Sequence, residues 1–463
     1  MATHSRVGTA GSRYEGARRY HRRRTYRQRG DRKLAIAGAG LYAGLLVKEQ
    51  FVRGPEGSRL PAGFLLRAVE TDSDVDRFVG INCAVTGEGE IARRLITYRP
   101  SSRRDDFVMV VEKDTDRVVS STCLLRWAVS FEGIPLSAAM LEMVVTDPDY
   151  RHHGLVRGQV DVFHERASQL GSDMCIIQGI PFYYRQFGYG YALDHAAVIE
   201  LEARLIPDVS QVSALLARTA VASDAAALSE LYASEMSSQG LHVQRTAADW
   251  DYLLTRSGRR FEIIERRGAG PLGYLLTSPA ANDLMIDESG LKDHGDAPMV
   301  LALLMPRCKG SLLICGNAAH SLSRAALALG GKTRIPAQWL VRIVDPATLL
   351  ARVGSVLESR LAQAGFSGID AEILVNFYKS ALRMRITRGK IAAVERAGFV
   401  DASMGADGGD LCIPPDAFTR LVFGYRDLDQ VRDAWPDTAI RAASRPLLDA
   451  LFPRMDSLIL MPY

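Results

Sequence analysis

The stretch from Asp147 to Arg157 combines residue types that could bind an anion. It carries two arginines and two histidines around a single glycine, Gly154. At the start of a helix the first backbone N–H groups have no intrahelical partner and the helix dipole is positive. A glycine there lets the backbone approach a ligand closely. If a helix begins at this point, the stretch is a cradle for a phosphate or pyrophosphate group.

The flanking sequence predicts the elements that this cradle needs. Leu141–Thr146 is rich in β-branched residues and predicts a strand. From Val156 onward apolar residues recur at spacings of four and three, and Gly171 stands where a helix would end. The turn Arg151–Val156 therefore joins a strand to a helix. By itself, R-x-x-G is more often an ordinary exposed connection, so the prediction depends on this context.

A second segment strengthens that context. After another predicted strand, Met174–Ile177, comes Gly179–Tyr191, which is rich in tyrosine and glycine. Together these segments resemble motifs A and B of the acyl-CoA N-acyltransferase (GNAT) superfamily, whose patterns are V-x-x-P-x-Y-R-x-x-G-x-G/A and F-Y-x-x-x-G-F/Y. Val156 departs from the first pattern, because many members carry Gly or Ala there, and the turn is expected to be slightly less open.

The resemblance implies acetyl-CoA as acyl donor and no metal. Strand backbone would bind the pantetheine arm, the turn would bind the pyrophosphate, and the end of the second strand would also contact CoA. The strand residues implied are Val144, Val145 and Thr146, and those of the second strand end are Gly179 and Ile180. The turn residues implied are Arg151, His152, His153, Gly154, Leu155, Val156 and Arg157. The alternative for the first three is a place in the core of the sheet.

Three residues are candidates for proton transfer. The resemblance gives Tyr184 the role of protonating the leaving thiolate, which suits a phenol of pKa about 10 and a thiol of about 8.5. The alternative is a packed aromatic ring, as expected for Phe182. Glu142, expected to share a strand face with Val144, is either a base whose pKa burial raises or the partner of a cation. Eis-type (enhanced intracellular survival) members use the terminal carboxylate, which would be Tyr463 here.

Charge and hydropathy set residues 1–61 apart. Residues 1–33 have a net charge of +9 in a chain of +4, so the remainder is mildly acidic. An Arg-rich tail without aromatic interleaving is expected to be a disordered arm, and we expect no nucleic-acid binding. Residues 34–47 are apolar but shorter than the roughly 20 residues of a membrane span. We interpret residues 1–61 as an extension from a misassigned start codon, with a weak membrane-associated segment as the alternative.

With 463 residues, the chain exceeds one usual core and should divide into domains. We predict a mixed α/β (α+β) fold with a catalytic GNAT domain at 62–206 and a degenerate second GNAT domain at 207–338. The repeat of Ser73-Asp74 as Ser223-Asp224 supports two copies. The second copy has acidic residues in place of the basic turn, which would repel a pyrophosphate. Residues 339–463 resemble the sterol-carrier-protein-like domain of Eis-type enzymes.

These patterns predict an acetyl-CoA-dependent N-acetyltransferase that acts on a primary amine of a small molecule, peptide or lysine. The alternative is a non-catalytic lipid or apolar-ligand binding protein that uses the C-terminal domain. Six scattered cysteines without a C-x-x-C pattern indicate reduced thiols and the cytoplasm. The nine histidines do not join them at metal-ligand spacing. The Eis-type resemblance implies a homo-oligomer, a hexamer, and no stable membrane span is expected.

Overall fold

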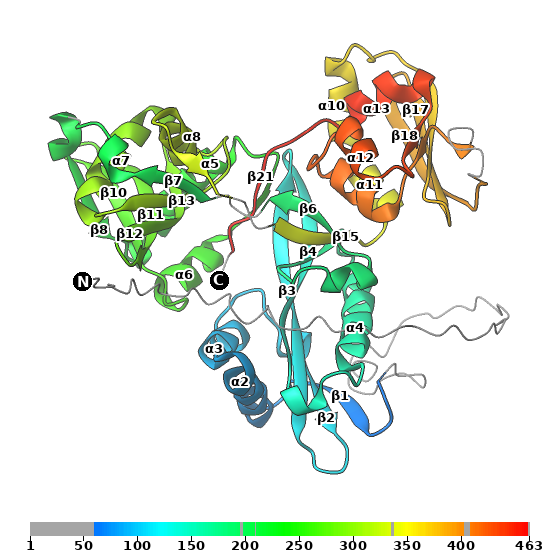
Figure 1. Cartoon of the computed structure of the whole chain (residues 1–463), viewed down its shortest axis with the longest axis horizontal. Coiled ribbons are helices and arrows are strands. Elements are labelled where there is room, and N and C mark those ends of the chain that lie inside the picture. Colours follow the sequence, from blue (N-terminus) through cyan, green and yellow to red (C-terminus); the bar gives the residue numbers. More distant parts are fainter. Residues whose placement is uncertain (1–59, 195–197, 209, 335–337, 402–407, 462–463) are drawn as a thin grey trace, which may run out of the picture. The chain divides into compact units, whose positions relative to one another are not determined.

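The computed structural model describes residues 60–194, 198–208, 210–334, 338–401 and 408–461 (Figure 1). Nearly all of the predicted extension 1–61 lies outside these residues, and so does Tyr463. Across the described ranges, no helix is both long enough and apolar enough to cross a membrane.

The first sheet carries the two motif segments. Its main path, in spatial order, is β1 (Phe64–Ala68), β2 (Phe107–Glu112), β3 (Val118–Phe131), β4 (Ile134–Thr146), β5 (Met174–Ile177), β15 (Gln338–Ile343) and β6 (Gly190–Asp194). The helices in this part of the chain are α2 (Asp72–Thr86), α3 (Gly89–Thr97) and α4 (Leu155–Gln169). The Thr71 hydroxyl and the Asp74 carboxylate form a capping box that starts α2. The predicted helix after the basic turn is confirmed, and Gly171 follows its end at φ 67°.

The second sheet repeats this plan. Its strands, in spatial order, are β8 (Leu215–Thr219), β10 (Phe261–Arg266), β11 (Gly270–Ala280), β12 (Asp283–Leu291), β13 (Ser311–Cys315), β7 (Val198–Glu202) and β14 (Lys332–Thr333). Its helices are α5 (Ala225–Met236), α6 (Ala247–Thr255), α7 (Ala297–Leu304) and α8 (Ser321–Ala328). In both sheets the fourth and fifth strands run parallel, and the next strand is antiparallel to the fifth. The predicted mixed α/β fold with tandem units is confirmed.

We call the first sheet with its helices the first half and the second sheet with its helices the second half. Each half contributes one strand to the sheet of the other. β15 comes from the end of the second half but lies between β5 and β6, where Leu340 pairs with both Ile177 and Tyr191. β7 comes from the end of the first half and lies between β13 and β14. The expected boundaries at 206/207 and 338/339 therefore separate these strands from the sheets that they complete. The apolar run Trp339–Val341 of β15 is buried on both faces of the sheet, and such a run does not indicate which sheet the strand joins.

The third sheet follows β15 in the chain. Its strands, in spatial order, are β18 (Lys390–Gly398), β17 (Ala381–Thr387), β16 (Ala371–Asn376), β19 (Leu411–Cys412) and β20 (Ala439–Ile440). Its helices are α9 (Pro346–Arg352), α10 (Gly354–Gln363), α11 (Pro415–Val422), α12 (Leu428–Ala434) and α13 (Arg445–Leu451). The sequence predicts one helix over 347–364; the structure has two, because the backbone leaves helical geometry at Val353. β17 and β18 form an antiparallel hairpin that turns at Arg388 and Gly389.

After the third sheet, the last described residues contact the first and second halves again. β21 (Ser457–Leu458) pairs with β9 (Leu241–Val243), which pairs in turn with β3. The Met461 carbonyl accepts hydrogen bonds from Arg245 (3.5 Å) and Arg259 (3.3 Å). Met461, the last described residue, is thus held by the second half.

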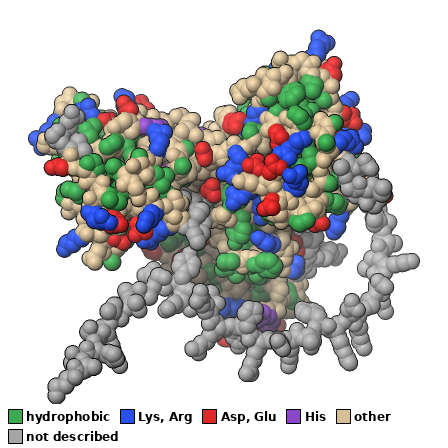
Figure 2. All heavy atoms as spheres, turned by 45° about the horizontal axis from the view of Figure 1, so that its top comes forward, with side chains coloured by type: hydrophobic (Ala, Val, Ile, Leu, Met, Phe, Trp, Pro, Cys, Tyr) green, Lys and Arg blue, Asp and Glu red, His purple; other side chains and the backbone are tan. Residues whose placement is uncertain are grey.

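Charged side chains of both signs are interspersed on one face of the molecule (Figure 2). Figure 2 shows acidic and basic side chains next to one another on the face drawn. Arg445, for example, lies 2.8 Å from Asp429 and 2.7 Å from Asp449. Such pairs neutralise one another locally and contribute little stability at an exposed site.

A buried ion pair crosses the second half. The side chain of Arg245 is fully buried and that of Glu288 is 2% exposed, and the two meet in a bidentate pair. The Tyr274 hydroxyl donates to Glu288 at 2.8 Å. The guanidinium also lies over the ring of Tyr232, 4.4 Å from its centroid. Burial alone would raise the pKa of Glu288, but Arg245, Arg259 and the Tyr274 hydroxyl together outweigh burial and leave that pKa below its ordinary value.

Glu288→Gln is expected to destabilise the protein by about 3 kcal/mol at pH 7, because it leaves a buried guanidinium unpaired. The lowered pKa of Glu288 means that its contribution is present above the unfolded value of about 4.3 and is lost as pH falls further. Urea unfolding at pH 7 and below pH 4 should show the difference between variant and wild type shrinking in acid. Asp76→Asn, which breaks the exposed pair with Arg93 at 2.8 Å, should change stability by less than about 1 kcal/mol. Equal losses in both variants would contradict the expectation.

Candidate active site

A bulge near the end of β4 shapes the site. β4 pairs with β5 over Ala138–Met140, then continues to Thr146 without a β5 partner among the described residues. Within this continuation two β4 residues, Met143 and Val144, stand opposite Thr122 of β3. Met143 has φ 54°, which is uncommon for a residue other than glycine. The bulge turns the end of β4 and separates it from β5.

The basic turn opens α4 as the sequence predicts. Gly154 is the N-cap residue, at φ 78° and ψ 10°, and its carbonyl accepts from the amides of Arg157 (3.1 Å) and Gly158 (3.3 Å). The amides of Leu155 and Val156 come before these and have no intrahelical acceptor. A Cβ placed on Gly154 would meet no atom within 4 Å, so the space beside the turn is open. The turn therefore offers amides and space to an anion.

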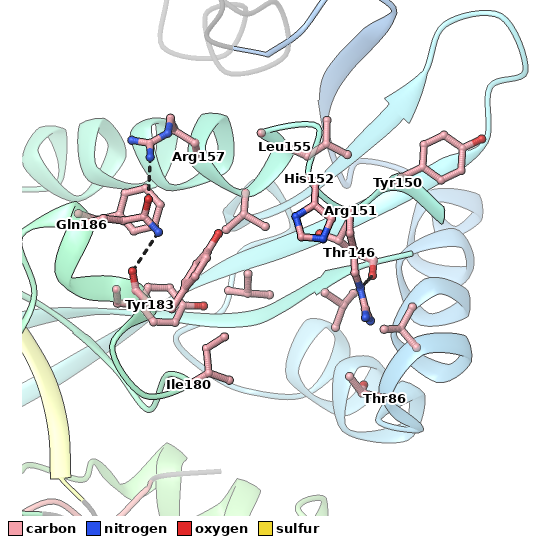
Figure 3. Close-up of a pocket in the computed structure, with 17 residues that line it drawn as sticks. Thr86, Thr146, Tyr150, Arg151, His152, Leu155, Arg157, Ile180, Tyr183 and Gln186 are labelled. Carbon is pink, nitrogen blue, oxygen red and sulfur yellow. Dashed lines mark hydrogen bonds between the residues drawn. The ribbon is translucent and has the colours of Figure 1, made fainter. Parts of the chain in front are cut away.

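A cavity of about 680 Å³ lies between the β4 end, the turn and the segment after β5 (Figure 3). Most of the residues predicted from sequence line it: Val144, Val145, Thr146, Arg151, His152, Gly154, Leu155, Val156, Arg157, Ile180 and Tyr184. Arg151 also donates to the Thr146 carbonyl at 3.4 Å, which ties the turn to the strand. The structure thus brings the two motif segments to one cavity.

Four predicted residues are placed differently. The His153 ring packs toward Phe64 and Tyr150, with ring centroids 6.1 and 6.4 Å apart, and is not among the residues that line the cavity. Glu142 Oε1 accepts from the Met143 amide at 3.2 Å. The bulge puts Val144 against the α4 side of the sheet, so Glu142 and Val144 do not share the expected face. Gly179 lies beneath a tyrosine ring, and Tyr463 is outside the described residues.

Tyr184 is the buried phenol of the cavity. It lies in a short 3-10 helix, η4 (Tyr183–Phe187), and is 5% exposed. Its ring is edge-on to that of Tyr183, with centroids 5.1 Å apart. Burial, reinforced by Tyr183 and the negative charge of Glu142, raises the pKa of Tyr184 well above that of a free phenol. At neutral pH the hydroxyl is therefore protonated and is available as a donor.

A polar bridge joins α4 to η4. Arg157 donates to the Gln186 side chain at 2.7 Å, and Gln186 donates to the Tyr183 carbonyl at 3.1 Å (Figure 3). The Arg157 guanidinium also lies 5.3 Å from the centroid of the Phe187 ring. These contacts hold Arg157 at the cavity wall.

Sequence reasoning missed several lining residues: Val85, Thr86, Tyr150, Tyr183, Gln186 and Phe187. Four of them lie within the two motif segments, and that position could have identified them as site residues: Tyr150, Tyr183, Gln186 and Phe187. Val85 and Thr86 end α2, about 60 residues earlier in the chain. Nothing local marks them, because only the fold brings the end of that helix to the cavity.

Comparison with known proteins agrees with this geometry. Residues 67–192 match the family model described as an acetyltransferase (GNAT) domain. The chain contains a GNAT domain. No curated protein matches the chain.

Three solved structures resemble most of the chain, each covering 86% of it. A probable N-acyltransferase from Enterococcus faecalis V583 has 14% identity and a TM-score of 0.67, with 100% of its own length covered. A GCN5-related N-acetyltransferase from Kribbella flavida has 17% identity, a TM-score of 0.63 and 100% coverage. Eis1 from Mycobacterium abscessus has 13% identity, a TM-score of 0.57 and 100% coverage. At these identities the similarity establishes the fold.

The counterpart of the GNAT site in the second half is closed by the chain itself. The fully buried Glu235 accepts from the amide of Leu291 at 3.2 Å, at the end of β12, and from the amide of Ser321 at 2.8 Å, at the start of α8. A Cβ on Gly290 would lie 2.4 Å from the Tyr274 ring. A carboxylate of the protein thus joins the end of β12 to the start of α8.

In the GNAT domain, the missing side chain of Gly179 leaves room for the ring of Tyr184. A Cβ at Gly179 would lie 2.1 Å from Cδ2 and 2.3 Å from Cε2 of Tyr184. Gly179→Ala is therefore expected to displace the ring and to cost about 1–3 kcal/mol in urea unfolding. The cost should fall when Tyr184→Leu frees the space, so a double-mutant cycle isolates the contact. Additive effects of the two substitutions would contradict this assignment.

Proposed function

We propose that the chain is an acetyl-CoA-dependent N-acetyltransferase that transfers an acetyl group to a primary amine of a small molecule, peptide or lysine. One observation carries the proposal: the open amides at Gly154 and the buried phenol of Tyr184 line the same cavity. The first can hold a pyrophosphate and the second can protonate a leaving thiolate. The GNAT domain match supports the same chemistry.

The donor would be held mainly by backbone. The amides of Leu155 and Val156 would bind the CoA pyrophosphate, with Arg151 and Arg157 supplying positive charge at its edge. The unpaired end of β4, Val144–Thr146, would bind the pantetheine arm in sheet fashion. The alternative of a place in the sheet core remains true of Val145, whose side chain is 5% exposed. The backbone of Val145 would thus bind the pantetheine arm while its side chain packs in the sheet.

The reaction would be a direct transfer. The neutral amine nitrogen attacks the thioester carbonyl, the C–N bond forms and the C–S bond breaks, and Tyr184 gives its proton to the departing sulfur. The proton lost by the amine goes to a carboxylate, for which Glu142 and the terminal carboxylate of Tyr463 are the two candidates. The position of Glu142 beside the bulge and its influence on Tyr184 favour a place near the reacting atoms.

The C-terminal domain would have a structural role here. Its sterol-carrier-protein-like fold is part of the proposal, as are a homo-oligomeric state and a cytoplasmic location. Between its sheet and helices, Phe418 packs on Phe377 and Phe452, with centroids 5.0 and 5.9 Å apart. Packed aromatic rings at its centre favour this role over the alternative of an apolar-ligand carrier.

Calorimetric titration of acetyl-CoA, paired with thiol release over a panel of primary amines, tests the proposal. Binding together with amine-dependent thiol release is the expected result. Failure to bind acetyl-CoA would overturn the enzyme assignment. Binding without turnover on any amine would favour a non-catalytic protein.

A further inference from the structure

Three consecutive hydroxyl side chains of β3 face the bulge of β4. They belong to Ser120, Ser121 and Thr122, which are polar and yet at most 1% exposed in the middle of the sheet. Their hydroxyls donate to the β4 carbonyls of Val145 (2.7 Å), Met143 (3.3 Å) and Glu142 (3.2 Å), respectively. Since a bulge disrupts the ladder between two strands, these hydroxyls provide partners for carbonyls on both sides of the extra residue.

A side chain from α2 buttresses this hydroxyl run on one face of the sheet. Asn82 is fully buried, and its Nδ2 donates to the Phe78 carbonyl at 2.8 Å and to Ser121 Oγ at 3.0 Å. Ser121 in turn donates to Met143, the residue at φ 54°. A chain of hydrogen bonds therefore runs from α2 to the strained residue of the bulge.

A second side chain buttresses the run on the opposite face. Gln159 of α4 is 1% exposed, and its Oε1 accepts from Ser120 Oγ at 2.9 Å. The single Ser120 proton is therefore shared between this oxygen and the Val145 carbonyl. The same hydroxyl lies 2.9 Å from Thr146 Oγ1. Helices on both sides of the sheet thus reach the bulge through polar groups that are buried completely.

Such a network is costly unless it serves a defined geometry. Buried hydroxyl and amide groups lose their water, and apolar residues would fill these positions at lower cost. The hydroxyls that face β4 are paired, although Asn82 Oδ1 and Gln159 Nε2 have no partner among the described residues. Each of the paired links restricts the backbone to one arrangement. The arrangement selected here is the one that turns Val144–Thr146 away from β5.

We propose that Asn82, Ser120 and Ser121 are positioning residues that set the direction of the β4 end and thereby the affinity for CoA. The inference rests on the proposed function, because it assumes that the β4 end binds the pantetheine arm. None of the three lines the cavity among the described residues, so they would act through Met143 and Val145.

Titration of CoA into Ser121→Ala and Asn82→Leu tests the proposal. We expect the Kd of CoA to rise about five- to tenfold in each, as the loss of one buried hydrogen bond allows. Ser130→Ala is the matched control: Ser130 is on the same strand, is 4% exposed and accepts from the Gly133 amide at 3.2 Å, at the far hairpin. Its Kd should stay within about twofold of wild type, and Ser121→Thr, which keeps the hydroxyl, should restore most of the affinity.

Steady-state kinetics separate positioning from general destabilisation. Positioning predicts a raised KM for acetyl-CoA with an unchanged KM for the amine, whereas destabilisation lowers the active fraction and hence kcat alone. A Kd equal to that of wild type in folded Ser121→Ala would overturn the inference, whether or not Asn82→Leu folds. If wild type itself does not bind CoA, the proposed function fails instead, and the two failures are distinguishable.

Discussion

Gly154→Glu is expected to weaken acetyl-CoA binding by about 100-fold or more. The new carboxylate would enter the open space beside the Leu155 and Val156 amides, where the pyrophosphate is proposed to bind. Two negative groups at one helix start repel, and a cost of several kcal/mol corresponds to roughly two or more powers of ten in Kd. Calorimetric titration of acetyl-CoA measures the loss directly.

Gly171→Glu is the matched control for this experiment. Gly171 lies just beyond the other end of α4, has φ 67° and, like Gly154, has no atom within 4 Å of an added Cβ. Both substitutions impose the same left-handed backbone on a side chain, at about 1–2 kcal/mol. Gly171→Glu should bind acetyl-CoA as wild type does. Equal weakening in both variants would attribute the loss to a damaged helix rather than to the cradle.

Tyr184→Phe is expected to lower kcat by about 100-fold while leaving acetyl-CoA binding unchanged, because only the proton donor is removed. Tyr183→Phe is the control, since Tyr183 is adjacent and lines the same cavity. Stopped-flow or steady-state thiol release at saturating donor gives kcat for each. An undiminished kcat in Tyr184→Phe would remove this residue from the chemistry.

The pH dependence gives a second test of the same role. Since burial raises the pKa of Tyr184, the hydroxyl stays protonated beyond the ordinary phenol value of about 10. The rate of wild type should therefore show no decline from loss of this proton below pH about 10. A fall of kcat in the neutral range that disappears in Tyr184→Phe would contradict the assignment.

The parts of the site that depend on local pattern could be predicted from sequence. A strand, a basic turn and an amphipathic helix follow from β-branched residues, Gly154 and apolar spacing, and the structure has all three. The turn after β5 was harder, because side-chain direction depends on backbone conformation. Phe182, expected to be a packed ring, has φ 69° and is 73% exposed.

The features that escaped prediction join residues far apart in the chain. The bulge at Met143 is marked by no glycine, and its support comes from Asn82, more than 60 residues earlier. The pairing of β15 with β5 links residues more than 160 positions apart. Local propensity carries no information about such partners, since it is the same whichever sheet the strand joins.

The exchange of β15 has a consequence for the synthesis of the protein. When residue 194 has left the ribosome, β5 and β6 still lack the strand that lies between them. At roughly 5–20 residues per second, Ile343 leaves the ribosome about 7 to 30 s later. During that interval the half that carries the site exposes two unpaired strand edges, which are sites of aggregation. The sheet that carries the site can therefore close only after the whole of the second half has been synthesised.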